Sequence, residues 1–91
     1  MKAHEVLSDE SKWTKESMAR DSHGRVCKEE SLTACSWCML GSLYLAYPSH
    51  PERQLAVGAV QNKLGMAIHI FNDDPKTTFN DVRNLLLELD I

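Results

Sequence analysis

Residues 34–47 read ACSWCMLGSLYLAY, and this stretch decides how the rest of the chain is arranged. Only Ser36, Gly41 and Ser42 interrupt its apolar run, and all three side chains are small. A segment that is apolar on every side must be covered by the rest of the domain. We therefore predict a buried central helix at about 33–47. A helix of this length covers only about 21 Å, which is too short to cross a bilayer.

The length of the chain predicts one domain that spans residues 1–91. The chain has 10 basic and 13 acidic residues and a net charge of −3, which argues against a nucleic-acid-binding surface. No apolar leader follows the first residues, so we expect a cytoplasmic protein without a membrane segment. Three cysteines without a secretion signal are typical of reduced thiols rather than of a disulfide framework.

The predicted central helix carries two further signals. Ser31 or Thr33 is expected to cap its first turn by accepting a hydrogen bond from a free backbone N–H group. Gly41 lies in its middle, where glycine costs about 1 kcal/mol relative to alanine. Such a cost is tolerable where another backbone approaches closely, so we expect a close neighbour at Gly41.

The front of the chain predicts small elements. A short helix is indicated by apolar side chains at helical spacing, Ala3, Val6 and Leu7. Trp13 stands alone in polar surroundings, which is typical of a residue that anchors a loop onto the core. Residues 21–24 have the composition of a tight turn, with Asp first and Gly last. The runs on either side predict a small β-hairpin near 17–27.

The back of the chain predicts three helices. Ser49 and Glu52 have the spacing of a capping box, and Gly65 is expected to end that helix in a left-handed conformation. Residues 66–71 fit a strand or a helical turn, and we favour a helix because a lone strand would have no partner. Thr78 predicts the cap of a last helix. Its apolar stripe is the clearest in the chain: Val82, Leu85, Leu86 and Leu89.

The predicted fold class is therefore mainly α. We expect a compact bundle of four to five short helices around the buried central helix at about 33–47. The small β-hairpin near 17–27 would pack at the front of this bundle, because an isolated hairpin is only marginally stable.

Several short fragments match the motifs of one family in order and spacing. They are Trp13-Thr14, Ala19-Arg20-Asp21 with Gly24, WCMLGSL at 37–43, FNDDP at 71–75, and Thr78. In these the chain resembles a family of small uncharacterised proteins of bacterial and phage genomes, which read W-T-x-G-x-x-A-R-D-x-x-G, C-A-L-G-A-L and W-N-D-x-P-x-x-T. The chain departs from the motifs at Glu16, where the family often has Gly, and at Phe71, where Trp is usual. The resemblance implies an architecture and an origin in a mobile element, but no reaction, because the family has no established activity.

Two polar clusters lie at the edges of apolar segments. Their members are Arg20, Asp21, Asn72, Asp73 and Asp74. They predict either a small polar pocket for a ligand or a partner side chain, or a structural staple between Arg20 and the turn at 72–75. Asn and Asp often form turns for purely local reasons, which favours the staple. Adjacent carboxylates alone do not indicate a metal site, because a hard cation needs six or more oxygen ligands.

The cysteines allow two chemical interpretations. A zinc site could be assembled from His23, Cys27, Cys35 and Cys38, but the last two lie in a strongly apolar segment, which favours buried thiols. A nucleophilic Cys38 would need a neighbouring base such as His69. Burial among apolar side chains would raise the pKa of the Cys38 thiol and make it inert. We expect no metal and no cofactor.

The functional hypothesis follows from what the sequence lacks. No Gly-rich phosphate loop, Ser–His–Asp order or H-E-x-x-H motif occurs. We expect a non-catalytic helical module that binds another protein, such as a phage or mobile-element inhibitor of a host or defence protein. The alternative is a small-molecule or nucleotide-binding protein, or a minor enzyme, that uses a pocket between Arg20-Asp21 and Asn72–Asp74. Self-association is a third possibility.

Overall fold

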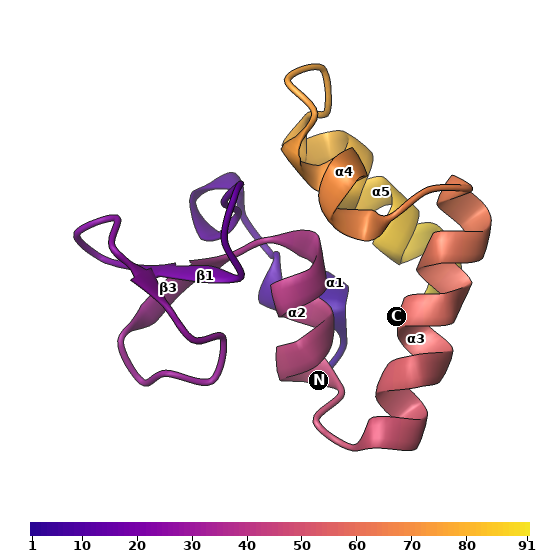
Figure 1. Ribbon diagram of the computed structural model, residues 1–91, viewed down its shortest axis with the longest axis horizontal. Helices are drawn as coiled ribbons and strands as arrows, with labels where there is room; N and C mark the ends of the chain where they lie inside the picture. Colours follow the sequence, from indigo (N-terminus) through magenta and orange to yellow (C-terminus); the bar gives the residue numbers. More distant parts are fainter.

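The computed structural model describes residues 1–91 and contains five α-helices, one 3-10 turn and three strands. Figure 1 shows these elements, which in chain order are α1 (Ala3–Val6), η1 (Glu10–Lys12), β1 (Ala19–Asp21), β2 (Val26–Cys27), β3 (Ala34–Trp37), α2 (Met39–Ala46), α3 (His50–Leu64), α4 (Ile68–Asp73) and α5 (Phe79–Leu89). The strands form one antiparallel sheet in the order β2-β1-β3.

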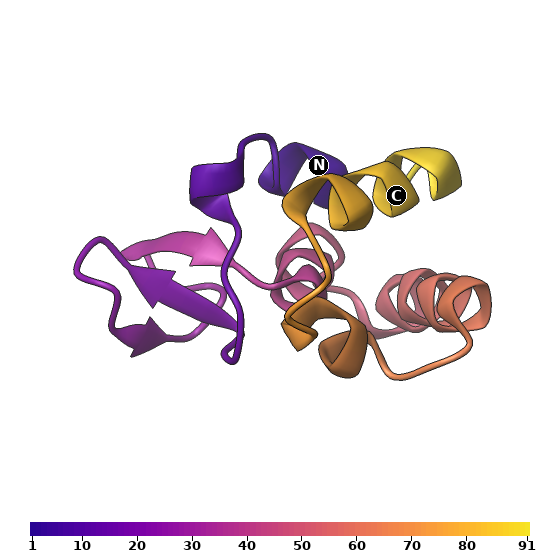
Figure 2. The ribbon, with the colours of Figure 1, turned by 90° about the horizontal axis from the view of Figure 1, so that it is seen from above.

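Helix α2 lies in the middle of the molecule. Figures 1 and 2 both place it between the sheet on one side and α3 on the other. It packs against α1, α3, α4 and β3. The apolar core forms around it from Ala3, Leu7, Met39, Leu43, Ala56, Val60, Ile68, Val82 and Leu86. The prediction of a buried central helix is therefore correct in kind.

The predicted bounds of that helix, about 33–47, are wrong at the front. Ala34–Trp37 is strand β3, and the helix begins only at Met39. The physical reason is that β1 offers a pairing edge, so Ala19 faces Trp37 across the ladder. Backbone hydrogen bonds along this ladder satisfy groups that a helix would have satisfied within itself. An apolar run contains no periodicity that separates these two outcomes.

The cap of the central helix also differs from the prediction. Neither Ser31 nor Thr33 caps it, because the helix begins several residues later. Cys38 is the N-cap residue, and its Sγ accepts a hydrogen bond from the backbone N–H of Gly41 at 3.2 Å.

Another part of the backbone lies close to Gly41, as its position in the helix predicts. A β-carbon at this residue would lie 2.1 Å from the carbonyl oxygen of Met18. The same carbonyl accepts a hydrogen bond from the backbone N–H of Cys38 at 3.1 Å. The absence of a side chain at Gly41 therefore lets the segment before β1 lie against the first turn of α2.

The predicted hairpin is confirmed, as β1 and β2. Gly24 has a φ of 77°, in the left-handed region that its place in the turn predicts. The predicted helix at 66–71 is also confirmed, shifted to Ile68–Asp73, so that Asn72 and Asp73 belong to α4 rather than to the following turn.

The helix ends agree with the sequence at two of the four predicted places, the cap of the central helix being one of the two exceptions. Gly65 ends α3 with a φ of 69°. Thr78 and Asp81 form a reciprocal capping box at the start of α5. The capping box predicted for Ser49 and Glu52 is absent, since Ser49 makes no side-chain cap hydrogen bond. None of the helices has both the length and the apolar character needed to cross a membrane.

Candidate functional site

Asn72 on α4 is a buried hub of hydrogen bonds. Its Oδ1 accepts from Trp13 Nε1 at 2.7 Å and from the backbone N–H of Met39 at 3.0 Å. Its Nδ2 donates to the Thr14 carbonyl at 3.1 Å and to Asp73 Oδ1 at 3.0 Å. The side chain is fully buried, and all four hydrogen-bonding positions of its amide are used. Asn72 therefore ties α4 both to α2 and to the segment before β1.

That segment, residues 13–18, connects η1 to β1, and further hydrogen bonds hold it in place. The backbone N–H of Glu16 donates to Asp73 Oδ1 at 2.9 Å. The ammonium group of Lys15 donates to the Asp74 carbonyl at 2.8 Å. These bonds join residues that are almost sixty positions apart in the chain. Distant residues of α4 and its following turn therefore help to set the conformation of segment 13–18.

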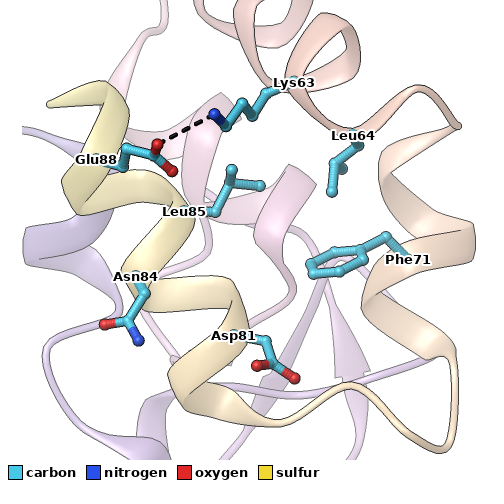
Figure 3. A pocket seen from close by; sticks show the side chains of 7 residues that line it. All are labelled: Lys63, Leu64, Phe71, Asp81, Asn84, Leu85 and Glu88. Atoms are coloured by element: carbon cyan, nitrogen blue, oxygen red, sulfur yellow. Dashed lines mark ion pairs between the residues drawn. The ribbon is translucent and has the colours of Figure 1, made fainter.

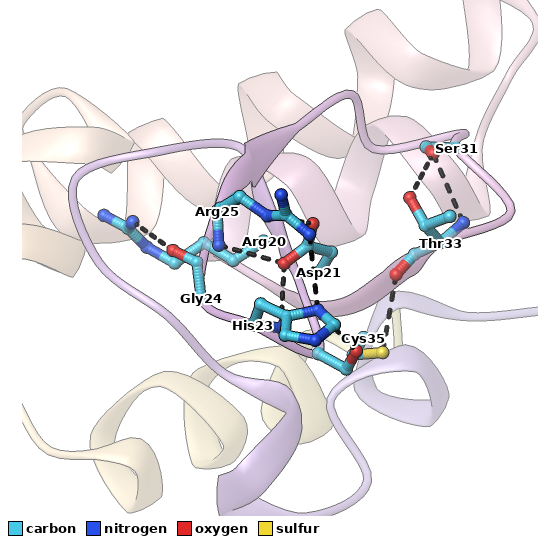
Figure 4. A network of polar contacts seen from close by, with 9 residues as sticks. Arg20, Asp21, His23, Gly24, Arg25, Ser31, Thr33 and Cys35 are labelled. Carbon is cyan, nitrogen blue, oxygen red and sulfur yellow. Dashed lines mark hydrogen bonds and ion pairs between the residues drawn. The ribbon is translucent and has the colours of Figure 1, made fainter.

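Arg20 and Asp21 stabilise the β1–β2 turn, as Figure 4 shows. The guanidinium group of Arg20 donates from Nη1 to the Gly24 carbonyl at 3.0 Å. Asp21 Oδ1 accepts from the backbone N–H groups of His23 at 2.9 Å and Arg25 at 3.0 Å. The bond from the backbone of Arg25 is the main reason that the pKa of the Asp21 carboxyl is lowered. Both charged groups thus have partners within their own hairpin.

The two predicted clusters meet at segment 13–18 but do not touch each other. Arg20 Nε donates to Thr14 Oγ1 at 3.1 Å, and its Nη2 donates to the Lys15 carbonyl at 3.3 Å. The cluster on α4 holds the same segment through its own bonds. The predicted staple therefore runs through segment 13–18, and not directly from Arg20 to the turn at 72–75.

Glu16 has an unusual backbone conformation within this segment. Its φ is 68°, in the left-handed region that side-chain-bearing residues avoid. Such a conformation costs roughly 1–2 kcal/mol for a residue with a β-carbon. The carboxylate of Glu16 forms no hydrogen bond or ion pair with the rest of the chain, although its backbone N–H is bound by Asp73. Glu16 therefore has a strained backbone, and its carboxylate has no partner within the chain.

A cavity of about 250 Å³ lies beside Glu16, and we call it the Glu16 cavity. It is lined by residues 16–18, by Cys38 and Leu40 at the start of α2, and by His69 and Asp73 of α4. The lining contains two carboxylates and no lysine or arginine. It also contains Ser17, whose Oγ is the one buried side-chain oxygen or nitrogen without a hydrogen-bond partner. Of the predicted site residues, only Asp73 lies here.

Sequence patterns do not point to Glu16, Ser17 or the cavity. A left-handed φ in a polar stretch leaves no periodic signal, and the contacts that enforce it come from α4. The one available signal is the motif that the chain resembles, in which Gly often stands at the position of Glu16. Glycine is the residue that adopts this φ without strain.

Cys38 is a buried thiol and not an activated one. It is 5% exposed, and burial raises the pKa of its thiol. The thiol therefore stays protonated at neutral pH, whereas the thiolate is the nucleophilic form. His69 lines the same cavity but forms no hydrogen bond with Cys38. No three side chains of His, Cys, Asp or Glu are grouped so that they could hold a metal ion.

The three thiols are expected to react in the order of their exposure. With iodoacetamide on the native protein, Cys35 should be modified first because it is exposed, and Cys38 last because it is buried with a raised pKa. Mass spectrometry of digests at increasing reaction times measures this order. The same reaction in denaturant is the control, where all three should react alike. Early modification of native Cys38 would contradict its burial.

A second cavity, of about 370 Å³, lies between α3, α4 and α5, and Figure 3 shows its lining. Lys63 and Glu88 form an ion pair across it at 3.0 Å. Asp81 accepts a hydrogen bond from the backbone N–H of Thr78 at 2.9 Å, so its carboxylate serves the helix cap. Three of its charged groups thus have partners, and the Glu16 cavity is the better candidate for binding a charged ligand.

Replacing Glu16 with glycine is expected to stabilise the protein. Glu16→Gly removes the β-carbon that disfavours a φ of 68°, and we expect the free energy of unfolding to rise by about 1 kcal/mol. Urea titration followed by circular dichroism measures this free energy. Glu16→Ala is the matched control, because it removes the carboxylate but keeps the β-carbon and should give no such gain. An equal gain in both variants would show that the charge of Glu16, and not its backbone strain, lowers the free energy of unfolding.

The comparisons with known proteins give one match. A model of a family of unknown function, DUF6197, matches residues 1–89. No curated protein and no solved structure matches the chain. The match agrees with the resemblance to uncharacterised proteins that the sequence motifs indicate. Since the model covers all but the last two residues, the chain belongs to the DUF6197 family of unknown function.

Proposed function

We propose that the protein is a non-catalytic module that binds a partner protein through the surface around the Glu16 cavity. The observation that carries the proposal is Glu16 itself, an exposed residue that lines the cavity with a left-handed backbone and whose carboxylate has no partner within the chain. Residues in costly backbone conformations cluster at functional sites, where surrounding contacts over-determine them. Here Asp73 and the other bonds to segment 13–18 supply those contacts.

Two exposed apolar side chains lie on or just before α4, the helix that supplies His69 and Asp73 to the cavity. Ile70 on α4 is 56% exposed, and Met66 just before this helix is 47% exposed. Ile70 and Asp73 are three residues apart on α4, so they share a face of the helix. An exposed apolar side chain beside a charged cavity resembles the centre and rim of a protein–protein contact.

The chemistry of the cavity favours a protein over a nucleotide as its ligand. Two carboxylates would repel a phosphate group. The volume of about 250 Å³ is also below the roughly 300–1,000 Å³ of cavities that hold drug-sized molecules. It is suited to a single side chain of a partner. The resemblance to proteins of phage genomes supports a host or defence protein as that partner.

Affinity capture with paired variants tests the proposal. The tagged wild-type protein is incubated with extract of the native cell, in parallel with Ile70→Gln and with Leu55→Gln as the matched control. Leu55 is 76% exposed on α3, away from the Glu16 cavity. We expect one partner to be captured by the wild type and by Leu55→Gln, and to be lost with Ile70→Gln. The reverse pattern, or capture of no partner, would refute binding through this surface.

Light scattering of the purified protein separates a partner from a second copy of the chain. A monomer at micromolar concentration agrees with the proposal. A dimer that dissociates on Ile70→Gln but not on Leu55→Gln would show that the surface around the Glu16 cavity binds a second copy of the chain.

A further inference from the structure

We propose that α3 binds α3 of a second copy of the chain in an antiparallel arrangement, which forms a symmetric dimer. Figures 1 and 2 both place α3 at the end of the molecule that lies opposite the sheet. The flank of α3 that we assign to this contact shares no residue with the lining of the Glu16 cavity. The inference therefore goes beyond the proposed function and does not depend on it.

An apolar cavity of about 280 Å³ lies along this flank, and we call it the Leu55 cavity. Its lining is apolar except for one carboxylate: Tyr47, Glu52, Leu55, Ala56, Ala59 and Ile91. Leu55 lines the cavity although most of this residue is exposed. In a dimer with two-fold symmetry each copy presents the same patch to the other. An exposed leucine beside an apolar cavity can therefore supply both halves of such a contact, with Leu55 of each copy entering the cavity of the other.

The charges on this flank are placed so that two antiparallel copies attract each other. Glu52 and Lys63 lie on the same flank of α3, and the midpoint between them falls between Val57 and Gly58, at the middle of the helix. A two-fold axis at this midpoint exchanges the two positions, so Glu52 of each copy lies opposite Lys63 of the other. A parallel arrangement would instead bring the two Glu52 carboxylates together, which is unfavourable.

Both charged groups are available for this contact. Glu52 is exposed and belongs to none of the ion pairs within the chain. Lys63 forms an ion pair with Glu88 at 3.0 Å, but its side chain is still 48% exposed. An ammonium group has three donors, so Lys63 can bond Glu52 of the second copy without releasing Glu88.

Small side chains between the two charges let the helices approach closely. Ala56 and Ala59 lie between Glu52 and Lys63 on the same flank, and the same two-fold axis exchanges them. Alanine on both sides favours the lower end of the about 8–10 Å that separates packed helix axes. A contact made by one 15-residue helix is smaller than the roughly 1,200 Å² of a stable interface, so we expect a weak dimer with a Kd of about 10⁻⁴ M.

Sedimentation velocity tests the dimer across a range of protein concentrations. We expect the wild type to be a monomer at about 10 μM and mostly a dimer at about 1 mM. Leu55→Gln should raise the Kd at least about tenfold, because it places an amide in the apolar cavity. Ile70→Gln is the matched control and should leave the Kd unchanged, since Ile70 is exposed on α4 and does not line the Leu55 cavity. A wild type that stays monomeric at the highest concentration, or an equal effect of both substitutions, would overturn the proposal.

A mixture of two charge variants tests the antiparallel arrangement. Glu52→Lys and Lys63→Glu should each dimerise at least about tenfold more weakly than the wild type, because like charges then meet at both ends of the contact. Mixed in equal amounts, the two variants should form a heterodimer about as tight as the wild-type dimer, because every lysine of the contact then faces a glutamate. Circular dichroism confirms that each variant is folded before mixing. Single variants that dimerise like the wild type, or a mixture that stays monomeric, would show that α3 does not pair in this way.

Discussion

Asn72→Ala is expected to lower the free energy of unfolding by about 3–5 kcal/mol, the largest loss that we predict for a polar residue. The substitution leaves Trp13 Nε1, the backbone N–H of Met39 and the Thr14 carbonyl without their partner. Each unsatisfied buried group costs about 1–3 kcal/mol. Urea titration followed by circular dichroism and by tryptophan fluorescence measures the loss, and the fluorescence comes from Trp13 and Trp37.

The matched control is Asn62→Ala on α3. Asn62 is exposed and its side chain makes no hydrogen bond, so its replacement should change stability by no more than about 0.5 kcal/mol. If Asn72→Ala were as mild as Asn62→Ala, Asn72 would not be the connection between α4, α2 and segment 13–18. The description of the Glu16 cavity would then lose its support, because Asn72 helps to hold that segment.

Gly41→Ala is expected to destabilise the protein by about 3 kcal/mol or more. Its β-carbon would lie 2.1 Å from the carbonyl oxygen of Met18, and a backbone atom cannot move aside as a flexible side chain can. Relief would require segment 13–18 to separate from α2 and to lose the hydrogen bond between Met18 and Cys38. Overpacking of this kind costs about 1–3 kcal/mol, and more when backbone contacts break.

Gly58→Ala on α3 is the matched control for Gly41→Ala. A β-carbon at Gly58 would meet no atom within 4 Å. Alanine in the middle of a helix is favoured over glycine, so we expect Gly58→Ala to stabilise the protein by about 0.5–1 kcal/mol. The two substitutions are chemically identical and should have opposite signs. Stabilisation by both substitutions would show that the contact between Met18 and Gly41 is not tight.

Local signals in the sequence predict the parts of this fold that depend on local physics. Thr78 caps the last helix as predicted, and it forms a capping box with Asp81 at the start of α5. Gly24 and Gly65 both adopt the left-handed conformation that their positions require. Such features need only neighbouring residues, so a single sequence contains the information for them.

The strand at Ala34–Trp37 depends instead on a distant pairing. Nothing within this segment distinguishes it from the start of a helix, and it becomes a strand because β1 lies alongside. The helix that follows begins at Cys38, whose Sγ serves as the cap. Cysteine is not among the usual capping residues, so the boundary between the two elements has no conventional signal.

The sequence predicts less of the candidate site than of the fold. Asp73 stands out as a charged residue in turn-like surroundings, yet it binds the backbone of Glu16, which its own neighbours do not indicate. The conformation of Glu16 is set by a bond to Asp73, which lies 57 residues away. Sequence patterns can mark polar clusters, but they cannot show which of the carboxylates is left without a partner.

The central claim is that Asp73 holds the backbone of Glu16 in a costly left-handed conformation beside the cavity. The most direct test is urea unfolding of the wild type, of Glu16→Gly and of Glu16→Ala. We predict that only Glu16→Gly is more stable than the wild type, because glycine adopts this φ without strain. A glycine variant that is less stable than the wild type, or an equal gain in the alanine variant, would contradict the account.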